Sequence, residues 1–272
     1  IGTRNIHTKD FMWMTNFNFA YNNNKVLREQ IPENQTTPGR EGYPVGAIFA
    51  LKSAGIDDEG YPLFYNKQGE KVTATELLKL NSAGASTLTA AEQRDLYSYI
   101  GSSEPLFSGG FNNTFTYRNW ELAVNFIFNL KMFVRCQPSY SLANFDRGMN
   151  TNRDILNRWT PENPNGTFPR LINSTDRPAE YIQYAEFALY EMSDTWVKRC
   201  DYVRLQNLRL AYTLPSELTK KAHLDKVTVG VEGRNLLVFG SDYKNYLDPE
   251  TMGNQFAQPI PKSVSLSLNV NF

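Results

Sequence analysis

The sequence predicts an all-β protein, namely a segment of a transmembrane antiparallel β-barrel with about six strands and long folded extracellular loops. Three observations support this fold class. Apolar and polar residues alternate over runs that are longer than an ordinary strand. The connections between these runs are alternately long and short, and aromatic residues gather at the ends of the runs. Together these features are typical of a sheet with lipid on one face and water on the other.

Composition excludes several other classes. The chain has 272 residues, with 28 Lys and Arg against 28 Asp and Glu, so it lacks the basic surface of a nucleic-acid binder. Mean hydropathy is −0.48, and no apolar run is long enough for a membrane-spanning helix. Aromatic residues make up 13% of the chain, and asparagine is abundant. This combination favours β-structure with one apolar and one wet face.

Alternation with a period of two residues defines the strands. In residues 120–133, every even position from Trp120 to Met132 is apolar, whereas the odd positions include Glu121, Asn125 and Asn129. Such a pattern predicts a strand with one apolar and one polar face. The same pattern recurs elsewhere, and the predicted strands are residues 11–21, 106–117, 120–133, 202–214, 225–239 and 263–272.

The strand at residues 202–214 departs from regular alternation. Leu208, Leu210 and Tyr212 share one parity, whereas Val203 and Leu205 have the other. An extra residue in the strand would bring both groups to one face, so the sequence predicts a β-bulge, or a strand top that rises above the apolar zone.

The connections indicate how the strands sit in a membrane. Arg118 and Asn119 alone join two strands, and residues 215–224 join two others, which suits short periplasmic turns. The remaining connections, at about residues 25–105, 134–201 and 240–261, are long and are expected to be extracellular loops.

Aromatic residues support this orientation. With the short turns at the periplasmic side, one interface would carry an aromatic girdle. The residues expected in it are Phe11, Trp13, Tyr117, Trp120, Tyr212 and Phe272.

The long loops contain local signals of structure. Thr89 and Glu92 have the spacing of a capping box, which predicts a helix over residues 89–100 that Gly101 could end. Residues 152–159 are a second helix candidate, and the apolar content of residues 42–57 favours a small hairpin.

Six strands cannot close a barrel, because a lipid-exposed sheet edge would leave backbone groups without partners. Either further strands lie in the loops or the rest of the wall lies elsewhere. We expect the chain to be the carboxy-terminal part of a larger barrel. The alternative is a soluble or surface-exposed β-rich module that binds glycans, which would remain soluble without detergent.

Several motifs resemble one family. Residues 202–215 read YVRLQNLRLAYTLP, which is similar to a signature of SusC/RagA-type TonB-dependent transporters of Bacteroidetes outer membranes. Further motifs agree in order along the chain. They are GGFNNTF at 109–115, RWTPENP at 158–164, GRNL at 233–236, DPE at 248–250 and QP at 258–259. One departure is the segment before Tyr202, where Lys198 to Asp201 replace the usual acidic-Asp-Gly-Ser stretch.

The resemblance implies a 22-stranded barrel in the outer membrane that imports glycans or peptides. It implies three partners besides membrane lipid. These are a SusD-like surface lipoprotein that acts as a lid, the amino-terminal barrel and plug portion that this chain lacks, and TonB acting through that portion. No cofactor is implied, and no acid–base pair or nucleophile–base set indicates an enzyme.

Two cysteines could form a disulfide. Cys136 and Cys200 flank adjacent predicted strands, so a bond between them would clasp the base of one extracellular loop in an oxidising environment. The alternative is two unpaired thiols that are offset along the strands.

Candidate substrate-binding residues come from two places. Asn125, Asn129, Glu232 and Arg234 are expected to face the lumen, where polar solutes could pass or where these side chains only hydrate the wall. Trp159 and Trp196 lie in loops and could stack on sugar rings or peptide side chains, or could pack within the loops.

An acidic turn at Asp57, Asp58 and Glu59 could hold a structural Ca²⁺. The residues lack alternating ligand spacing, so a solvated acidic turn is the alternative.

Overall fold

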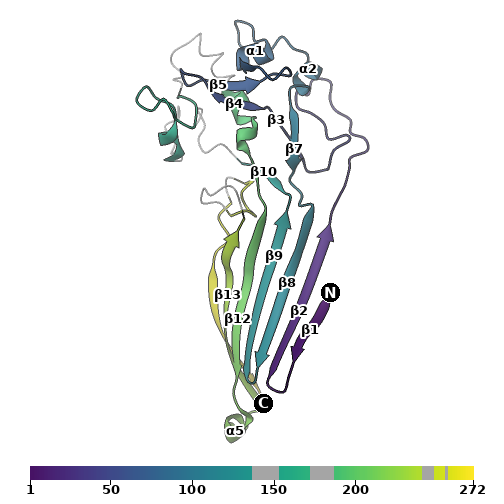
Figure 1. Ribbon diagram of the computed structural model, residues 1–272, viewed down its shortest axis with the longest axis vertical. Coiled ribbons are helices and arrows are strands. Elements are labelled where there is room, and N and C mark those ends of the chain that lie inside the picture. Colours follow the sequence, from purple (N-terminus) through teal and green to yellow (C-terminus); the bar gives the residue numbers. More distant parts are fainter. Residues whose placement is uncertain (137–152, 172–186, 241–247, 255–256) are drawn as a thin grey trace.

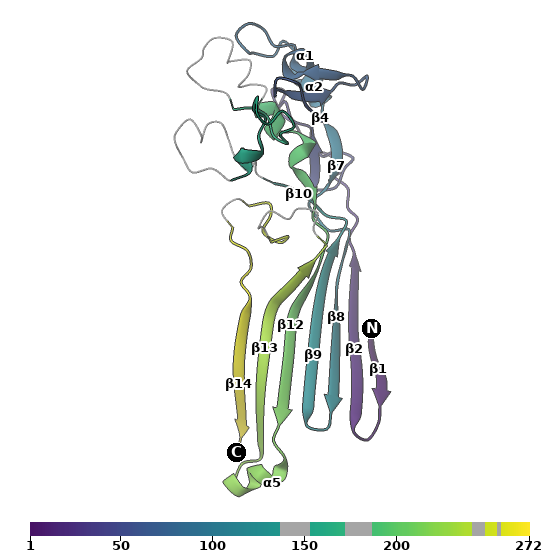
Figure 2. The same cartoon turned by 60° about the vertical axis from the view of Figure 1, so that its left-hand side comes forward.

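The computed structural model describes residues 1–136, 153–171, 187–240, 248–254 and 257–272. It consists of a tall curved sheet and a group of smaller elements at one end of that sheet (Figure 1). The turned view separates the strands of the sheet and shows the short turns and the chain's carboxyl end at the opposite end (Figure 2). We call the tall sheet the wall.

The wall has seven strands in the order β1-β2-β8-β9-β12-β13-β14, and every neighbouring pair is antiparallel. The strands are β1 (Gly2–His7), β2 (Phe11–Tyr21), β8 (Phe107–Tyr117), β9 (Trp120–Leu130), β12 (Tyr202–Thr213), β13 (Lys226–Phe239) and β14 (Ser263–Asn271). All six predicted strands are therefore present, with ends close to those predicted. The prediction missed β1, which pairs with β2.

The wall has one apolar and one polar face, because residues directly opposite each other in neighbouring strands share a face. Trp13 lies opposite Phe115, which lies opposite Leu122 in β9. The face continues through Leu210, opposite Leu122, to Val231. Many of its side chains are exposed, including Phe111, Trp120, Val229 and Leu266. A continuous exposed apolar surface of this kind is unfavourable in water, so it needs an apolar environment.

The predicted bulge in β12 is confirmed. The pairing of β12 with both neighbours shifts between Leu205 and Asn207. Against β9, Leu205 lies opposite Phe126 and Asn207 opposite Asn125, so Gln206 is the extra residue. The bulge therefore brings Leu205 to the apolar face that already carries Leu208.

A small polar cluster around Asn113 lies within the apolar face. Asn113 is only 7% exposed, and its Oδ1 accepts hydrogen bonds from Trp13 Nε1 at 2.9 Å and Thr15 Oγ1 at 2.8 Å. Thr15 Oγ1 also accepts a bond from Asn5 of β1 at 2.6 Å. Because these groups satisfy one another, the apolar face can contain them at low cost.

The connections at the lower end of the wall are short. Arg118 has a φ of 50° in the turn between β8 and β9. Between β12 and β13 the chain forms α5 (Ser216–Thr219) and the 3₁₀ helix η3 (Lys220–Ala222). Within the described residues, no helix is long and apolar enough to cross a membrane.

The upper elements form small sheets of their own. Strand β3 (Ala47–Ala50) pairs with β7 (Ser98–Ser102), and β4 (Ser53–Ile56), β5 (Pro62–Tyr65) and β6 (Lys71–Thr73) form a second sheet. The predicted hairpin over residues 42–57 is therefore wrong, because β3 and β4 pair with different partners. Helix α1 (Ala74–Leu78) follows β6 and has a capping box of its own.

The predicted helix at residues 89–100 is shorter than expected. Helix α2 (Ala90–Arg94) has the predicted capping box between Thr89 and Glu92. Residues 98–102 instead form β7, where Tyr99 lies opposite Phe49. Gly101 does not end the helix. It lies under the Phe133 ring, where a Cβ would collide with that ring. Residues 153–157 form the 3₁₀ helix η1 (Arg153–Asn157), within the second helix candidate.

The upper elements have a separate hydrophobic core. It contains Leu51, Phe64, Ala74, Leu77, Leu189, Tyr190 and Trp196. We call β3 to β7 together with residues 187–196 the loop module. Below it, β10 (Phe133–Arg135) and β11 (Val197–Arg199) pair with each other and connect the module to β9 and β12. The loop module is thus packed around its own apolar centre above the wall.

Candidate functional site: the polar face of the wall and its upper mouth

The predicted aromatic residues gather at the turn end of the wall. Phe11 lies opposite Tyr117, which lies opposite Trp120, and the Trp120 and Tyr212 rings are 4.6 Å apart between centroids. Trp13 stacks on Phe115 with centroids 5.6 Å apart. Phe272 follows β14 at the same end, where Asn271 lies opposite Lys226. The strand register therefore places all six residues where a girdle would lie.

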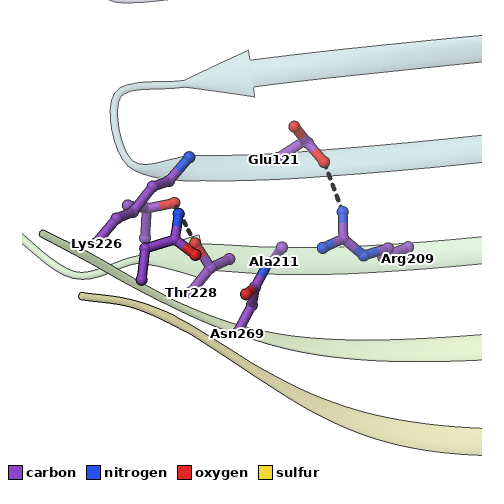
Figure 3. Close-up of a pocket in the computed structure, with 8 residues that line it drawn as sticks. Glu121, Arg209, Ala211, Lys226, Thr228 and Asn269 are labelled. Atoms are coloured by element: carbon purple, nitrogen blue, oxygen red, sulfur yellow. Dashed lines mark hydrogen bonds and ion pairs between the residues drawn. The ribbon is translucent and has the colours of Figure 1, made fainter.

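The lower part of the polar face contains a hollow of about 200 Å³ that is lined by polar and charged side chains. Glu121 of β9 and Arg209 of β12 form an ion pair across it, with 2.7 Å between Oε1 and Nη1 (Figure 3). Lys226, Thr228 and Asn269 complete its border from β13 and β14. This surface is suited to contact polar groups through water or hydrogen bonds.

Four predicted lumen residues lie on this polar face and contact their neighbours. Asn125 donates to Gln206 Oε1 at 3.3 Å, and Asn129 donates to the Tyr202 hydroxyl at 2.8 Å. Glu232 accepts a hydrogen bond from Asn207 at 2.8 Å and forms an ion pair with Arg234. Asn125, Asn129 and Glu232 thus connect adjacent strands, whereas Arg234 pairs within β13. Whether the four side chains also contact a solute stays a prediction.

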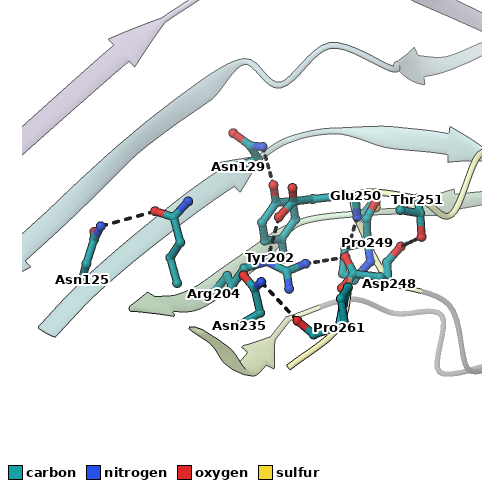
Figure 4. A network of polar contacts seen from close by, with 12 residues as sticks. Asn125, Asn129, Tyr202, Arg204, Asn235, Asp248, Pro249, Glu250, Thr251 and Pro261 are labelled. Atoms are coloured by element: carbon teal, nitrogen blue, oxygen red, sulfur yellow. Dashed lines mark hydrogen bonds and ion pairs between the residues drawn. The ribbon is translucent and has the colours of Figure 1, made fainter. Parts of the chain in front are cut away.

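A buried arginine at the upper mouth joins the wall to the segment after β13. Arg204 donates from Nε to Glu250 Oε1 at 2.7 Å and pairs through Nη2 with Asp248 (Figure 4). Its side chain is 2% exposed. Asp248 Oδ1 also accepts the backbone N–H of Glu250 at 3.0 Å, which fixes the carboxylate.

The same segment contributes apolar packing. Met252 is 1% exposed and belongs to a small core with Met132, Cys136, Cys200 and Tyr202. Residues 248–252 are therefore held over the upper end of the wall by both charge and packing. Arg204 and Asp248 each belong to a sequence motif, but nothing in their spacing indicates that the two side chains meet.

The predicted disulfide is wrong, because both cysteines are free thiols in the structure. The register of β10 and β11 explains this. Phe133 lies opposite Arg199 and Arg135 opposite Val197, so Cys136 and Cys200 flank opposite ends of the ladder. Burial raises the pKa of Cys136 to about 11 and that of Cys200 to about 12. The second alternative, offset unpaired thiols, is the one observed.

Both loop tryptophans make packing contacts within the loops. Trp196 is 3% exposed and stacks on Phe168 with centroids 5.8 Å apart, so the prediction that it could stack on a substrate is wrong. Trp159 lies over Gly60, and the Arg170 guanidinium lies 5.3 Å from its ring centroid. These contacts tie residues 158–170 to the turn at residues 57–60.

The acidic turn is stabilised by hydrogen bonds between its own residues. Asp57 Oδ1 accepts backbone hydrogen bonds from Glu59 at 2.9 Å and Tyr61 at 2.8 Å. Among the residues that the structure describes, no group of three or more potential metal ligands gathers.

These observations define the chain as a length of β-barrel wall with a folded loop module at one end. No family model matches it. Two curated TonB-dependent receptors of Formosa agariphila are similar to it over most or all of its length. Receptor P3 is 29% identical over 92% of this chain and 24% of the receptor's own length. Receptor P26 is 25% identical over 100% of this chain and 28% of that receptor's length.

Solved structures agree with the curated relatives. The chain matches a structure of the RagAB peptide transporter with a TM-score of 0.72 and 24% identity, over 100% of this chain and 28% of that chain. The chain also matches a structure of the RagAB peptide importer in the 'open-open' state, with a TM-score of 0.70, 22% identity and the same coverage of both chains. The chain is homologous to TonB-dependent receptors and has the fold of a RagA-type barrel wall, which confirms the resemblance in the sequence. It spans about a quarter of the length of the relatives it matches.

Proposed function

We propose that this chain is the carboxy-terminal part of the wall of a SusC/RagA-type, TonB-dependent nutrient importer in the outer membrane. The single observation that carries the proposal is the two-faced wall, whose exposed apolar face and polar opposite face recur over six of its seven strands, β2 to β14. Similarity to TonB-dependent receptors over nearly the whole chain supports the same assignment.

The wall itself needs further strands. Both β1 and β14 are edge strands of the sheet, and backbone groups at a lipid-exposed edge would lack partners. The proposal therefore includes the remaining barrel and plug portion, through which TonB would act. In this scheme the chain binds and encloses solutes and performs no catalysis.

The loop module is the proposed place of contact with a SusD-like surface lipoprotein. It lies at the end of the wall away from the short turns and is held by its own core (Figure 1). A lid that closes over the barrel needs a firm rim, which a packed module provides better than solvated loops do. The structural similarity to the RagAB peptide transporter supports such a partner.

Uptake by the full-length receptor tests the proposal. The gene that contains this chain would be deleted, and growth would be measured on a panel of glycans and of peptides, with and without TonB. We expect growth on at least one nutrient to require both the gene and TonB. Fractionation of the receptor into the soluble phase without detergent would contradict the membrane assignment and support the soluble glycan-binding module instead.

A further inference from the structure

A pocket in the loop module lies outside the polar face of the wall. It has a volume of about 250 Å³ and lies between β3, the residue before β7 and the top of β10. Apolar groups from Ile48, Phe49 and Met192 form much of its lining. The only charged residue in the described lining is Arg135, and Tyr97 lies beside it.

Arg135 lacks a counter-charge within the described part of the chain. Its Nη2 donates to the Phe49 carbonyl oxygen at 2.5 Å, which anchors one arm of the guanidinium. Its Nη1 is buried and has no hydrogen-bond partner. The described ion pairs involve other arginines and one lysine.

This arrangement is costly unless something completes it. A buried polar group without a partner loses its hydration and gains nothing in return. Burial lowers the pKa of Arg135, since the charged form is less well solvated there. An arginine nevertheless stays protonated at neutral pH, so the positive charge remains next to the pocket.

The chemistry of the pocket selects one kind of ligand. A planar guanidinium with a free donor arm matches a carboxylate, which can accept two parallel hydrogen bonds. The apolar remainder matches an aliphatic group about the size of one amino-acid side chain. Because Arg135 lines the pocket, a carboxylate seated there would lie next to its guanidinium.

We infer that this pocket binds a carboxylate carried on an apolar group, with Arg135 as its anion-binding residue. Such a group occurs at the carboxyl end of a peptide, and a carboxylate also occurs on acidic sugars. The inference rests on the proposed function only in that the pocket would capture a solute for import.

The test uses the full-length receptor, purified in detergent with whatever partner co-purifies. Ligand-observed NMR would measure binding of N-acetyl-leucine, its neutral amide and glucuronate. We expect N-acetyl-leucine to bind about tenfold more tightly than the amide, because the amide lacks the charge that Arg135 recognises. The apolar lining predicts weaker binding of glucuronate.

Three variants locate the site. Arg135→Gln removes the charge and should weaken N-acetyl-leucine binding about tenfold or more. Thr37→Trp fills the pocket from its exposed rim and leaves the guanidinium intact, so it should weaken binding as well. Arg28→Gln removes an exposed loop arginine outside the pocket and should leave binding unchanged.

Unchanged binding in Arg135→Gln, or in Thr37→Trp if the first variant fails to fold, would overturn the inference. Tighter binding of glucuronate than of N-acetyl-leucine would overturn the claim that the pocket selects a ligand with an apolar group. Failure of the proposed function is distinguishable. A receptor that binds the probe through Arg135 without TonB-dependent uptake contradicts only the importer, and uptake without probe binding contradicts only the pocket.

Discussion

Arg204 and Asp248 lie 44 residues apart in the sequence and form a buried ion pair at the upper mouth of the wall. Their side chains are 2% and 7% exposed. The pair joins two of the motifs on which the family resemblance depends, one in β12 and one after β13. It therefore fixes a loop segment to the wall where solutes would enter.

Replacing Arg204 by Gln should destabilise this junction. The substitution leaves Asp248 buried without a cation, and removal of one partner of a buried pair typically costs about 3–5 kcal/mol. We expect the folded receptor to convert to the unfolded form at a lower temperature, measured as the band shift of heated samples on SDS gels.

Arg234→Gln is the matched control, because Arg234 also faces the polar side but has a side chain that is 63% exposed. An exposed ion pair contributes only about 0–1 kcal/mol. Equal shifts for the two variants would show that the Arg204 pair has no special role.

The apolar face should reject charge. Leu266→Arg places a cation on the exposed apolar side of β14, which near a bilayer midplane costs about 2–4 kcal/mol. We expect less assembled receptor in the outer membrane, measured by heat-modifiable bands. Ser265→Arg is the neighbouring control on the polar face and should assemble normally. Normal assembly of both variants would argue against lipid on the apolar face.

The bulge at Gln206 should tolerate deletion better than a regular position does. Removing Gln206 leaves Leu205 opposite Phe126 and Asn207 opposite Asn125, so both faces are kept against β9. Removing Ala123 shifts part of β9 by one residue and turns its side chains to the wrong faces. We expect the Gln206 deletion to assemble with lowered stability and the Ala123 deletion to fail. Assembly of the Ala123 deletion would contradict this register.

The buried thiols should be unreactive in the folded receptor. Burial raises the pKa of Cys136 to about 11 and of Cys200 to about 12, from an ordinary value of 9.0. We expect iodoacetamide at pH 8 to modify neither until the protein is denatured, and the intact mass to show no disulfide. Rapid alkylation of the native protein would contradict the burial of both thiols.

The same shifts predict a pH dependence. A folded pKa above the unfolded value means that the folded state holds its proton more tightly. This contribution to stability is complete below pH 9 and is lost as pH rises from about 9 through 11 and 12. Cys200→Ser should reduce this alkaline loss, measured by thermal unfolding between pH 8 and 11.

The wall could be predicted because every second residue of its strands records which side is apolar. Strand β1 was missed because Ile6 is the main apolar residue in its interior and a register shift next to Asn5 interrupts its alternation. The loop module was predicted only where the signal is local, as in the Thr89 capping box. The pairing of β7 with β3 depends on contacts between distant segments, which no local pattern records.

The site was less predictable than the wall for the same reason. The alternation of apolar and polar residues along β9 and β13 predicts that Asn125 and Glu232 lie on the polar face, as the strand register shows. The ion pairs of Arg204 and the unpaired Nη1 of Arg135 depend on how distant loops fold onto these residues. The spacing of residues in the sequence does not indicate such contacts. The disulfide prediction failed because adjacency of strands does not fix the offset between two residues.

The separate core of the loop module has an evolutionary consequence. Residues that pack around Phe64 and Trp196 make up a centre of their own, distinct from the small core of Met132 and Tyr202 at the top of the wall. Recombination could therefore exchange the module as a block while the scaffold below keeps its inherited form. Such receptors would then diversify by exchanging whole loop modules rather than by accumulating single substitutions.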